Sequence, residues 1–395
     1  MTENKDIYLA SKPRYEILDG LRGVAAMLVV VYHLFETYFH GAPDQPLNHG
    51  YLAVDFFFVL SGFVIGYAYD DRWNRMTMWN FFKRRLVRLH PMVILGTLFG
   101  ALLFYFGDCP DFQFIKETSP WLVLLVMLWG FTMIPMGTGM DIRGWGETNS
   151  LNGPAWSLQW EYFANILYAL IFRRLGKVAL ALCVAVFAAM TVILCLNIDV
   201  TGFLSLRDYA SYTVVGGWAL TPDQLQIGLT RLMYPFFCGL LLSRMGWLIK
   251  VRGGFWWCSL MIVVVLAMPW MGTDTTGEGR WTNGLYEAVC ILICFPLIVS
   301  IGAGSSVLGG KSAAINKFLG DISYPIYITH YPLIYMQMGW VRSHADAPLG
   351  QHIFVAVCIF VLAIFVAYSA YRLYDLPVRE WLRNKLFKPA TSKTI

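Results

Sequence analysis

The segment RYEILDGLRGVAAMLVVVYH, residues 14–33, is polar at its start and becomes a membrane-grade apolar run after Gly23. Arg22 stands at the entrance of this run and His33 lies deep within it. In an α-helix, two residues eleven positions apart share one face and lie about 16 Å apart along the axis. An ionisable side chain inside a membrane-spanning helix is costly, so it normally faces the bundle interior and indicates a functional site. The alternatives are that Arg22 reaches lipid head groups and that His33 hydrogen-bonds a neighbouring helix.

The composition of the whole chain is that of a membrane protein. Its 395 residues are 57% hydrophobic and 14% charged, whereas soluble domains are about 45–50% apolar and about 25% charged. The net charge of +5 is carried by clusters beside the hydrophobic runs, so it indicates membrane topology rather than nucleic-acid binding. The eight cysteines show no metal-ligand spacing and imply no disulfide framework.

The hydrophobic runs predict an all-α polytopic membrane protein with about ten transmembrane helices and both termini in the cytoplasm. The expected spans are 20–40, 51–68, 92–107, 157–172, 178–197, 226–248, 255–272, 286–303, 320–341 and 352–374. A further run, 121–136, is short for ~30 Å of hydrocarbon, and the flanking charges require an even number of crossings there, so we expect a re-entrant or interfacial segment. The chain then divides into a cytoplasmic tail (1–19), a ten-helix domain (20–374) and a basic cytoplasmic tail (375–395).

Ionisable residues on five expected spans lie at similar depth. They are expected in the outer half of the membrane: His33, Asp55, Glu161, Arg231 and His330. Five such groups at matching depth indicate one site rather than five separate anchors. Arg22 lies on the inner side, so the sequence suggests a path from an inner basic site to an outer acid-base cluster.

The basic loop RRLVRLHP, residues 84–91, lies on the same inner side. Its spacing places Arg84 and Arg88 on one helix face, with Arg85 beside them. Guanidinium groups offer planar, bidentate donors to phosphate. A topology anchor that follows the positive-inside rule explains the loop equally well.

The longest outer loop, 198–225, contains Asp208 and the aromatic residues Tyr209, Tyr212 and Trp218. Such a loop could contact a polar, ring-shaped acceptor, since aromatic faces pack on sugar rings. An interfacial aromatic belt explains it almost as well.

Five motifs occur in order along the chain: LDGLRGVAAMLVVVYH with Arg22 and His33, DFFFVLSGF (55–63), RRLVRLHP (84–91), PAWSLQWEYF (154–163) and LGDISYPIYITHYPL (319–333). In order and spacing they resemble the membrane acyltransferase-3 family over essentially the whole chain. The resemblance implies a bacterial inner (plasma) membrane enzyme that moves an acyl group, usually acetyl, from cytoplasmic acyl-CoA to a hydroxyl of an extracytoplasmic or lipid-linked glycan. One departure is the closing motif, which tends to read Glu-x-Pro in the family and here reads Asp375-Leu376-Pro377.

The resemblance also assigns roles to residues. It marks Arg22 and His33 as an essential pair, and Ser157 with Glu161 as site residues. It implies that acyl-CoA, as acetyl-CoA, is the co-substrate and that its phosphates contact Arg84, Arg85 and Arg88. Residues expected to bind substrate or support the site are Trp156, Ser157, Arg231, Tyr324 and His330.

We expect His33 to be the general base that takes the proton of the acceptor hydroxyl, with Asp55 or Glu161 orienting its ring. Arg22 would steer the pantetheine arm or the diphosphate. No metal is expected, and direct transfer and a covalent acyl-enzyme both stay open. The alternative function is a proton-coupled transporter or flippase of a glycan or lipid intermediate, which also collects ionisable residues on helices. A flippase for neutral sugars would not need the arginine loop.

Overall fold

The computed structural model describes residues 12, 14–39, 44–107, 109, 114–207, 211–272 and 280–387. Every regular element in these ranges is helical, as predicted. Seven helical segments are long and apolar enough to cross a membrane: α1 (Glu16–Glu36), Gly50–Arg75 with α2 (Ala53–Tyr69) at its centre, α3 (Met78–Phe106), α6 (Lys177–Cys195), α7 (Pro222–Met245), Trp281–Gly304 and Leu349–Leu386. The protein is therefore a multi-pass membrane protein of all-α class.

The three other expected spans correspond to α5 (Ala155–Leu170), α8 (Gly254–Ala267) and α11 (Lys311–Ser343). Helices α5 and α8 are short, and α11 is 33 residues long but carries many polar side chains. The count of ten spans and the cytoplasmic placement of the termini remain predictions.

Helix α4 (Pro120–Gly130) forms within the run that we expected not to cross. Ser119 caps its first turn by accepting a hydrogen bond from the Leu122 amide, and Pro120 occupies the first helical position. Eleven residues of helix span about 17 Å, roughly half of the hydrocarbon core. This length agrees with a re-entrant or interfacial segment.

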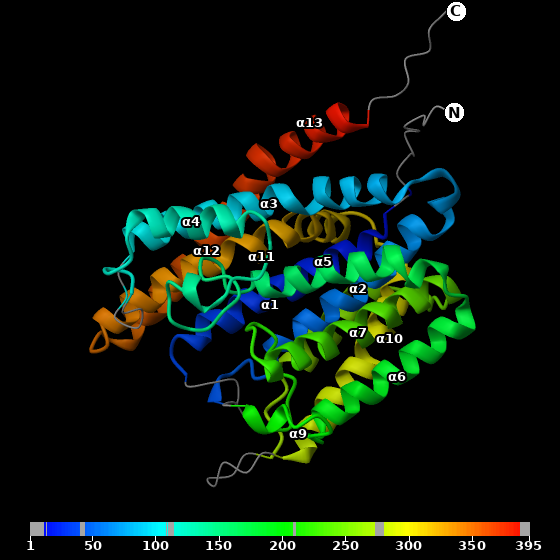
Figure 1. Cartoon of the computed structure of the whole chain (residues 1–395), viewed down its shortest axis with the longest axis horizontal. Helices are drawn as coiled ribbons and strands as arrows, with labels where there is room; N and C mark the ends of the chain where they lie inside the picture. The colour runs from blue at the N-terminus through cyan, green and yellow to red at the C-terminus, as the bar shows by residue number, and fades with distance from the viewer. Residues whose placement is uncertain are drawn as a thin grey trace, which may run out of the picture.

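The centre of the bundle consists of α1 packed along α11 and α2 packed along α7 (Figure 1). Glycines let the second pair approach closely. A Cβ atom at Gly62 would lie 1.8 Å from the carbonyl oxygen of Phe236, and one at Gly239 would lie 2.0 Å from that of Val59. Small residues at such contacts are typical of helix pairs in membranes, where close packing replaces the hydrophobic driving force.

Two helices are interrupted by π-helical turns. Cys290–Cys294 joins α9 (Trp281–Val289) to α10 (Phe295–Gly304), and Tyr371–Asp375 joins α12 (Leu349–Ala370) to α13 (Leu376–Leu386). Helix α13 lies against α3 (Figure 1). Much of the region expected as a basic tail is thus a helix docked on the bundle, while Lys388 lies outside the described residues.

Candidate active site

Two adjoining cavities open between α1, α2, α5 and α11. The first, here the arginine cavity, is lined by Arg22, Val54, Phe57, Phe58, Ser61, Val64, Arg85, Arg88, Leu89, Ser157, Leu158, Glu161, Ser323, Tyr324, Tyr327 and Arg379. The second and larger, here the histidine cavity, is lined by Val29, Tyr32, His33, Glu36, Thr37, Gln45, Gly50, Tyr51, Val54, Trp145, Glu147, Gly153, Pro154, Trp156, Val215, Trp218, Arg231, Tyr327, Tyr331, Met338 and Arg342. Val54 and Tyr327 line both, so the cavities meet at these two side chains.

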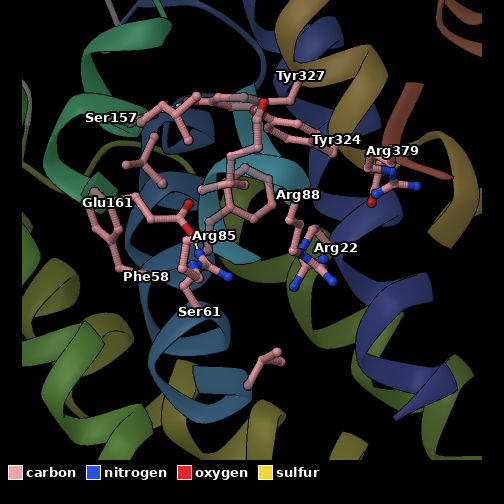
Figure 2. A pocket seen from close by; sticks show the side chains of 16 residues that line it. Arg22, Phe58, Ser61, Arg85, Arg88, Ser157, Glu161, Tyr324, Tyr327 and Arg379 are labelled. Carbon is pink, nitrogen blue, oxygen red and sulfur yellow. Dashed lines mark hydrogen bonds and ion pairs between the residues drawn. The ribbon is translucent and has the colours of Figure 1, made fainter. Parts of the chain in front are cut away.

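The arginine cavity is strongly basic (Figure 2). Its lining contains four guanidinium groups and one carboxylate, that of Glu161, while Arg379 also pairs with Asp375, which does not line the cavity. Glu161 is bound by Arg85, whose Nη2 lies 2.6 Å from Oε1, and by the hydroxyl of Ser61 at 3.0 Å. Arg22 has only a long contact of 3.6 Å to Asp19. No hydrogen bond or ion pair joins Arg88 to another residue of the described ranges. The cavity therefore carries positive charge that its own carboxylate does not neutralise.

The basic loop contributes two of its three arginines to this cavity. Arg85 and Arg88 line it, one helical turn apart on α3. Arg84 does not line it, and its guanidinium lies over the ring of Phe387, 4.5 Å from the centroid. Of the three arginines expected to contact CoA, the structure thus brings Arg85 and Arg88 to this cavity but not Arg84, because α3 turns Arg84 towards the end of α13.

Glu161 lines the arginine cavity and not the cavity of His33. The segment before α5 is folded into the bundle, where Asn152 donates a hydrogen bond of 2.8 Å to the carbonyl oxygen of Ile328 on α11. Pro154, the residue before α5, lines the histidine cavity, whereas Ser157 and Glu161 on α5 line the arginine cavity. The structure therefore does not bring Glu161 into the cavity of His33, as the sequence predicted, and the outer position of both residues stays a prediction.

His33 has a carboxylate partner on its own helix. Its Nδ1 lies 2.7 Å from Oε2 of Glu36, and the hydroxyl of Tyr331 donates to the same oxygen at 3.3 Å. Asp55 and Glu161 do not orient this ring, contrary to our expectation. Glu36 follows His33 by three residues, a spacing at which side chains meet on a helix, so the sequence did contain the signal. A donated Nδ1–H leaves Nε2 as the basic nitrogen.

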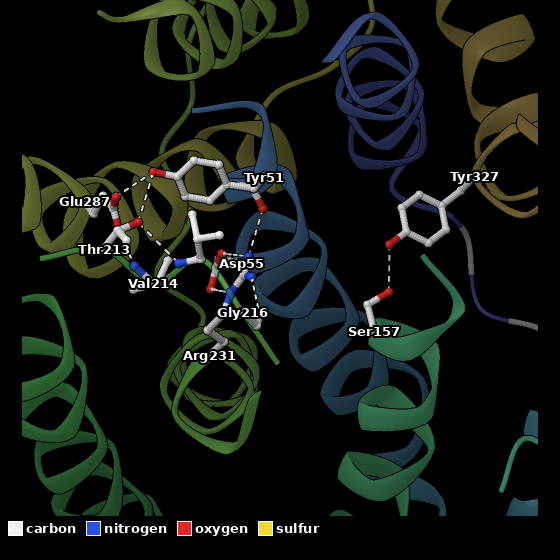
Figure 3. Close-up of polar contacts among 10 residues, drawn as sticks. Tyr51, Asp55, Ser157, Thr213, Val214, Gly216, Arg231, Glu287 and Tyr327 are labelled. Carbon is white, nitrogen blue, oxygen red and sulfur yellow. Dashed lines mark hydrogen bonds and ion pairs between the residues drawn. The ribbon is translucent and has the colours of Figure 1, made fainter. Parts of the chain in front are cut away.

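Both carboxylate oxygens of Asp55 accept hydrogen bonds from Arg231 (Figure 3). Two hydrogen bonds of 2.7 and 3.3 Å join the pair, and both side chains are buried. Arg231 also donates to the carbonyl oxygens of Tyr51 and Gly216, at 2.8 and 3.0 Å. A buried carboxylate neutralised in this way holds α2, α7 and the loop before α7 together, and is not available to His33.

Glu287, which the sequence did not single out, holds the same loop from the other side (Figure 3). It accepts hydrogen bonds from the Tyr51 hydroxyl at 2.5 Å, the Val214 amide at 2.6 Å and the Asn283 amide at 2.8 Å. This fixes the end of the long loop, from which Val215 and Trp218 reach the histidine cavity. The expected contacts from Asp208 and Tyr209 lie outside the described residues.

A second carboxylate missed from the sequence, Glu147, lines the histidine cavity. The hydroxyl of Tyr335 donates to its Oε2 at 3.4 Å. Removal from water raises the pKa of Glu147 to about 8, against the lowering effect of Arg143, and the nearby charge of Glu36 raises it further. Near neutral pH this carboxyl is largely protonated and can donate a hydrogen bond into the cavity.

Two hydroxyl groups stand where the cavities meet. Ser157 Oγ lies 2.7 Å from the hydroxyl of Tyr327, and both lie within reach of the Pro154 carbonyl oxygen, at 3.0 and 3.3 Å (Figure 3). Tyr324 lines the arginine cavity and donates to the carbonyl oxygen of Leu89 at 2.7 Å. The junction is thus polar on one side only, since Val54 forms the other.

Of the two remaining predicted residues, Trp156 lines a cavity and His330 is buried between the helices. Trp156 lines the histidine cavity, with its ring 5.2 Å from the guanidinium carbon of Arg231. His330 is fully buried, lines neither cavity and lies beside His33, with ring centroids 5.4 Å apart. Across the residues that the structure describes, no group of three or more His, Cys, Asp or Glu side chains is arranged to hold a metal ion.

Comparison with known proteins gives a family and several relatives. The family described as "Acyltransferase domain" matches residues 15–372. The acyltransferase MdmB of Streptomyces mycarofaciens is 24% identical over 89% of this chain and 88% of its own length. Protein 2 in the picA locus of Rhizobium radiobacter is 33% identical over 40% of this chain and 81% of its own length.

A Staphylococcus aureus (strain COL) protein named as an O-acetyltransferase is 37% identical over 96% of this chain, which spans 60% of that relative's length. No solved structure matches. The family match runs through α1, where Arg22 and His33 reach the two cavities, and on through α11 and α12. The chain therefore belongs to the membrane acyltransferase-3 family and is an acyl-transferring enzyme.

Proposed function

We propose that the protein moves an acyl group, acetyl in the simplest case, from acyl-CoA in the arginine cavity to a hydroxyl group of an acceptor in the histidine cavity. The observation that carries this proposal is the junction at Val54 and Tyr327, which both cavities share. At this junction the basic arginine cavity, which suits an anion, adjoins the cavity of His33, whose ring is oriented by Glu36. Family membership favours acyl transfer over the alternative of a proton-coupled transporter or flippase.

The donor assignment is supported by the charge of the arginine cavity. Arg22, Arg88 and Arg379 line it, and its one carboxylate, Glu161, is bound to Arg85. Charged hydrogen bonds from guanidinium to phosphate are among the strongest in proteins, and their planar fork matches phosphate oxygens. The diphosphate and 3′-phosphate of acyl-CoA supply such groups. We place this cavity on the cytoplasmic side of a bacterial inner membrane, in keeping with the basic residues that flank it.

His33 performs the proton transfer in this mechanism. Glu36 holds Nδ1, so Nε2 takes the proton of the acceptor hydroxyl as its oxygen bonds to the thioester carbonyl carbon. The carbon–sulfur bond then breaks, and the leaving thiolate takes the proton from His33, which returns to its neutral form. Ser157 and Tyr327 stand at the junction, where an O–H group can donate to the negative oxygen that develops on the carbonyl.

The acceptor we propose is a glycan or a lipid-linked carbohydrate. Three tryptophans, Trp145, Trp156 and Trp218, line the histidine cavity, where their faces can pack against a sugar ring. Glu36 and Glu147 line the same cavity and can hydrogen-bond hydroxyl groups. A cavity with apolar faces and a few polar groups is the usual form of a small-molecule site.

A His33→Gln variant tests the proposal. Glutamine keeps a hydrogen-bonding side chain but cannot take a proton at neutral pH. Purified protein in liposomes, given acetyl-CoA and a glycan acceptor, should release free CoA, and the variant should lose at least ~10²-fold of this rate. Its CoA affinity should stay unchanged, because His33 does not line the arginine cavity. Proton flux without CoA release in the parent would instead indicate a transporter.

A further inference from the structure

Arg379 reaches the arginine cavity from the last helix of the described chain, α13 (Figure 2). Its side chain is 26% exposed, and Nη2 lies 3.0 Å from Oδ2 of Asp375. Asp375 closes the π-helical turn before α13, and its side chain is only 2% exposed. The second oxygen of this carboxylate, Oδ1, is buried and has no hydrogen-bond partner among the described residues. One carboxylate thus holds Arg379 at the cavity wall.

Three guanidinium groups from three helices gather at this wall: Arg22 from α1, Arg88 from α3 and Arg379 from α13 (Figure 2). No hydrogen bond or ion pair of Arg88 occurs within the described ranges, although it interacts electrostatically with Asp375, and Arg22 has only its 3.6 Å contact to Asp19. Like charges in a partly buried space repel one another more strongly than they do in water. An anion with several oxygens relieves this repulsion by binding between them.

The position of α13 is fixed by contacts away from the cavity. Phe387, directly after α13, is buried and packs beneath the guanidinium of Arg84 on α3. The same helix carries Arg88 into the cavity one turn later. The Arg84 contact therefore helps to hold α13, which carries Arg379, against α3, which carries Arg88.

We propose that Arg379 binds a phosphate group of the acyl donor and that Asp375 is the positioning residue that holds it. This inference rests on the proposed function, and it extends the donor site to a helix that the sequence indicated only as a basic tail. The ligand chemistry is a phosphate ester or diphosphate. The head group of an anionic phospholipid offers the same chemistry, so the experiment must separate the two sources.

The test compares Arg379→Ala with Arg383→Ala in full-length protein purified in detergent. Arg383 is the matched control, because it lies one turn further on α13, is 52% exposed and does not line the cavity. Affinity is measured by calorimetry for CoA, dephospho-CoA and pantetheine, with size-exclusion elution and thermal unfolding as checks of folding. We expect Arg379→Ala to bind CoA at least ~10-fold more weakly, the effect of one charged hydrogen bond. Its pantetheine affinity and the CoA affinity of Arg383→Ala should match the parent.

Conservative variants test the positioning role. Arg379→Lys keeps the charge without the planar fork and should restore part of the affinity. Asp375→Asn should weaken CoA binding but leave pantetheine binding unchanged, and Asp375→Glu should regain CoA affinity because it restores the carboxylate. A general loss of folding would instead affect both ligands equally.

The outcomes separate this inference from the proposed function. If the parent binds CoA no better than pantetheine, the proposed donor is wrong. If the parent prefers CoA and Arg379→Ala shares that preference undiminished, Arg379 is not a phosphate ligand and the inference fails. If added phosphatidylglycerol weakens CoA binding in the parent but not in Arg379→Ala, while CoA affinity without lipid is equal in both, Arg379 binds lipid and the inference is overturned.

Discussion

Nδ1 of His33 lies 2.7 Å from Oε2 of Glu36, one turn further along α1. The two residues therefore keep their geometry whatever the neighbouring helices do, because a single helix carries both. A carboxylate in this position orients the imidazole ring, selects its tautomer and stabilises the imidazolium that forms when Nε2 takes a proton.

Replacing Glu36 by glutamine should slow acyl transfer at least ~10²-fold at neutral pH, the scale of a general-base contribution. The amide can donate to Nδ1, which would place the ring proton on Nε2 and block it as a base. Initial rates of CoA release measure the effect, and calorimetry should show unchanged CoA affinity because Glu36 lines only the histidine cavity. Near-parental rates in Glu36→Gln would show that this carboxylate does not assist the base.

Arg88→Ala should weaken CoA binding by roughly 1.5–3 kcal/mol, the range for a hydrogen bond to a charged group. Lys83→Ala is a suitable control, since Lys83 lies on α3, carries the same charge and lines neither cavity. Dephospho-CoA and CoA, titrated into both variants, show which phosphate Arg88 contacts. Equal losses in the two variants would indicate a general effect of charge on α3 rather than a specific contact.

The topology is tested by cysteines introduced at Gly139 and Gly176. No other atom lies within 4 Å of a Cβ built at either glycine, so both substitutions fit. In a background where the exposed Cys358 is replaced by serine, a membrane-impermeant thiol reagent should label Gly139→Cys in intact cells. Gly176→Cys should react only after permeabilisation. If Gly139→Cys reacted only after permeabilisation and Gly176→Cys reacted in intact cells, α4 would cross the membrane and α5 would begin on the cytoplasmic side.

The pH dependence of stability should carry a contribution from Glu147. Its pKa is about 8 in the folded protein against 4.5 ordinarily, so the folded state binds more protons than the unfolded state between these values. Stability therefore declines as the pH rises from about 4.5 to about 8. Thermal unfolding in detergent should show a steeper decline in the parent than in Glu147→Gln, which keeps a neutral side chain. Parallel curves would mean that Glu147 is already ionised in the folded protein.

Local periodicity predicted the part of the site that one helix carries. Arg22 and His33 line the two cavities because eleven residues of helix bring both to one face, and this needs no knowledge of the neighbours. Glu36 was equally accessible from its spacing to His33. The position of Arg379 at the cavity could not be predicted in this way, because a basic residue near the end of a membrane protein is usually interpreted as a topology anchor.

Which residues share a cavity was predicted less well. Counting from the end of a hydrophobic run ignores how the loop before it folds, and the segment before α5 is hydrogen-bonded to α11 through Asn152. Glu161 therefore lines the arginine cavity instead of sharing a cavity with His33. The same segment also brings Glu147 to the wall of the histidine cavity, a position that depends on tertiary contacts alone.

The wall that Val54 and Tyr327 form between the two cavities also bears on which part of the donor has to move during the proposed reaction. Because the two cavities share these lining residues, the proposed mechanism lets CoA stay in the arginine cavity and the acceptor stay in the histidine cavity. Only the short end of the donor must reach the partition. In the proposed mechanism, the acyl group passes between the two cavities at Val54 and Tyr327, so that neither CoA nor the acceptor has to cross the bilayer.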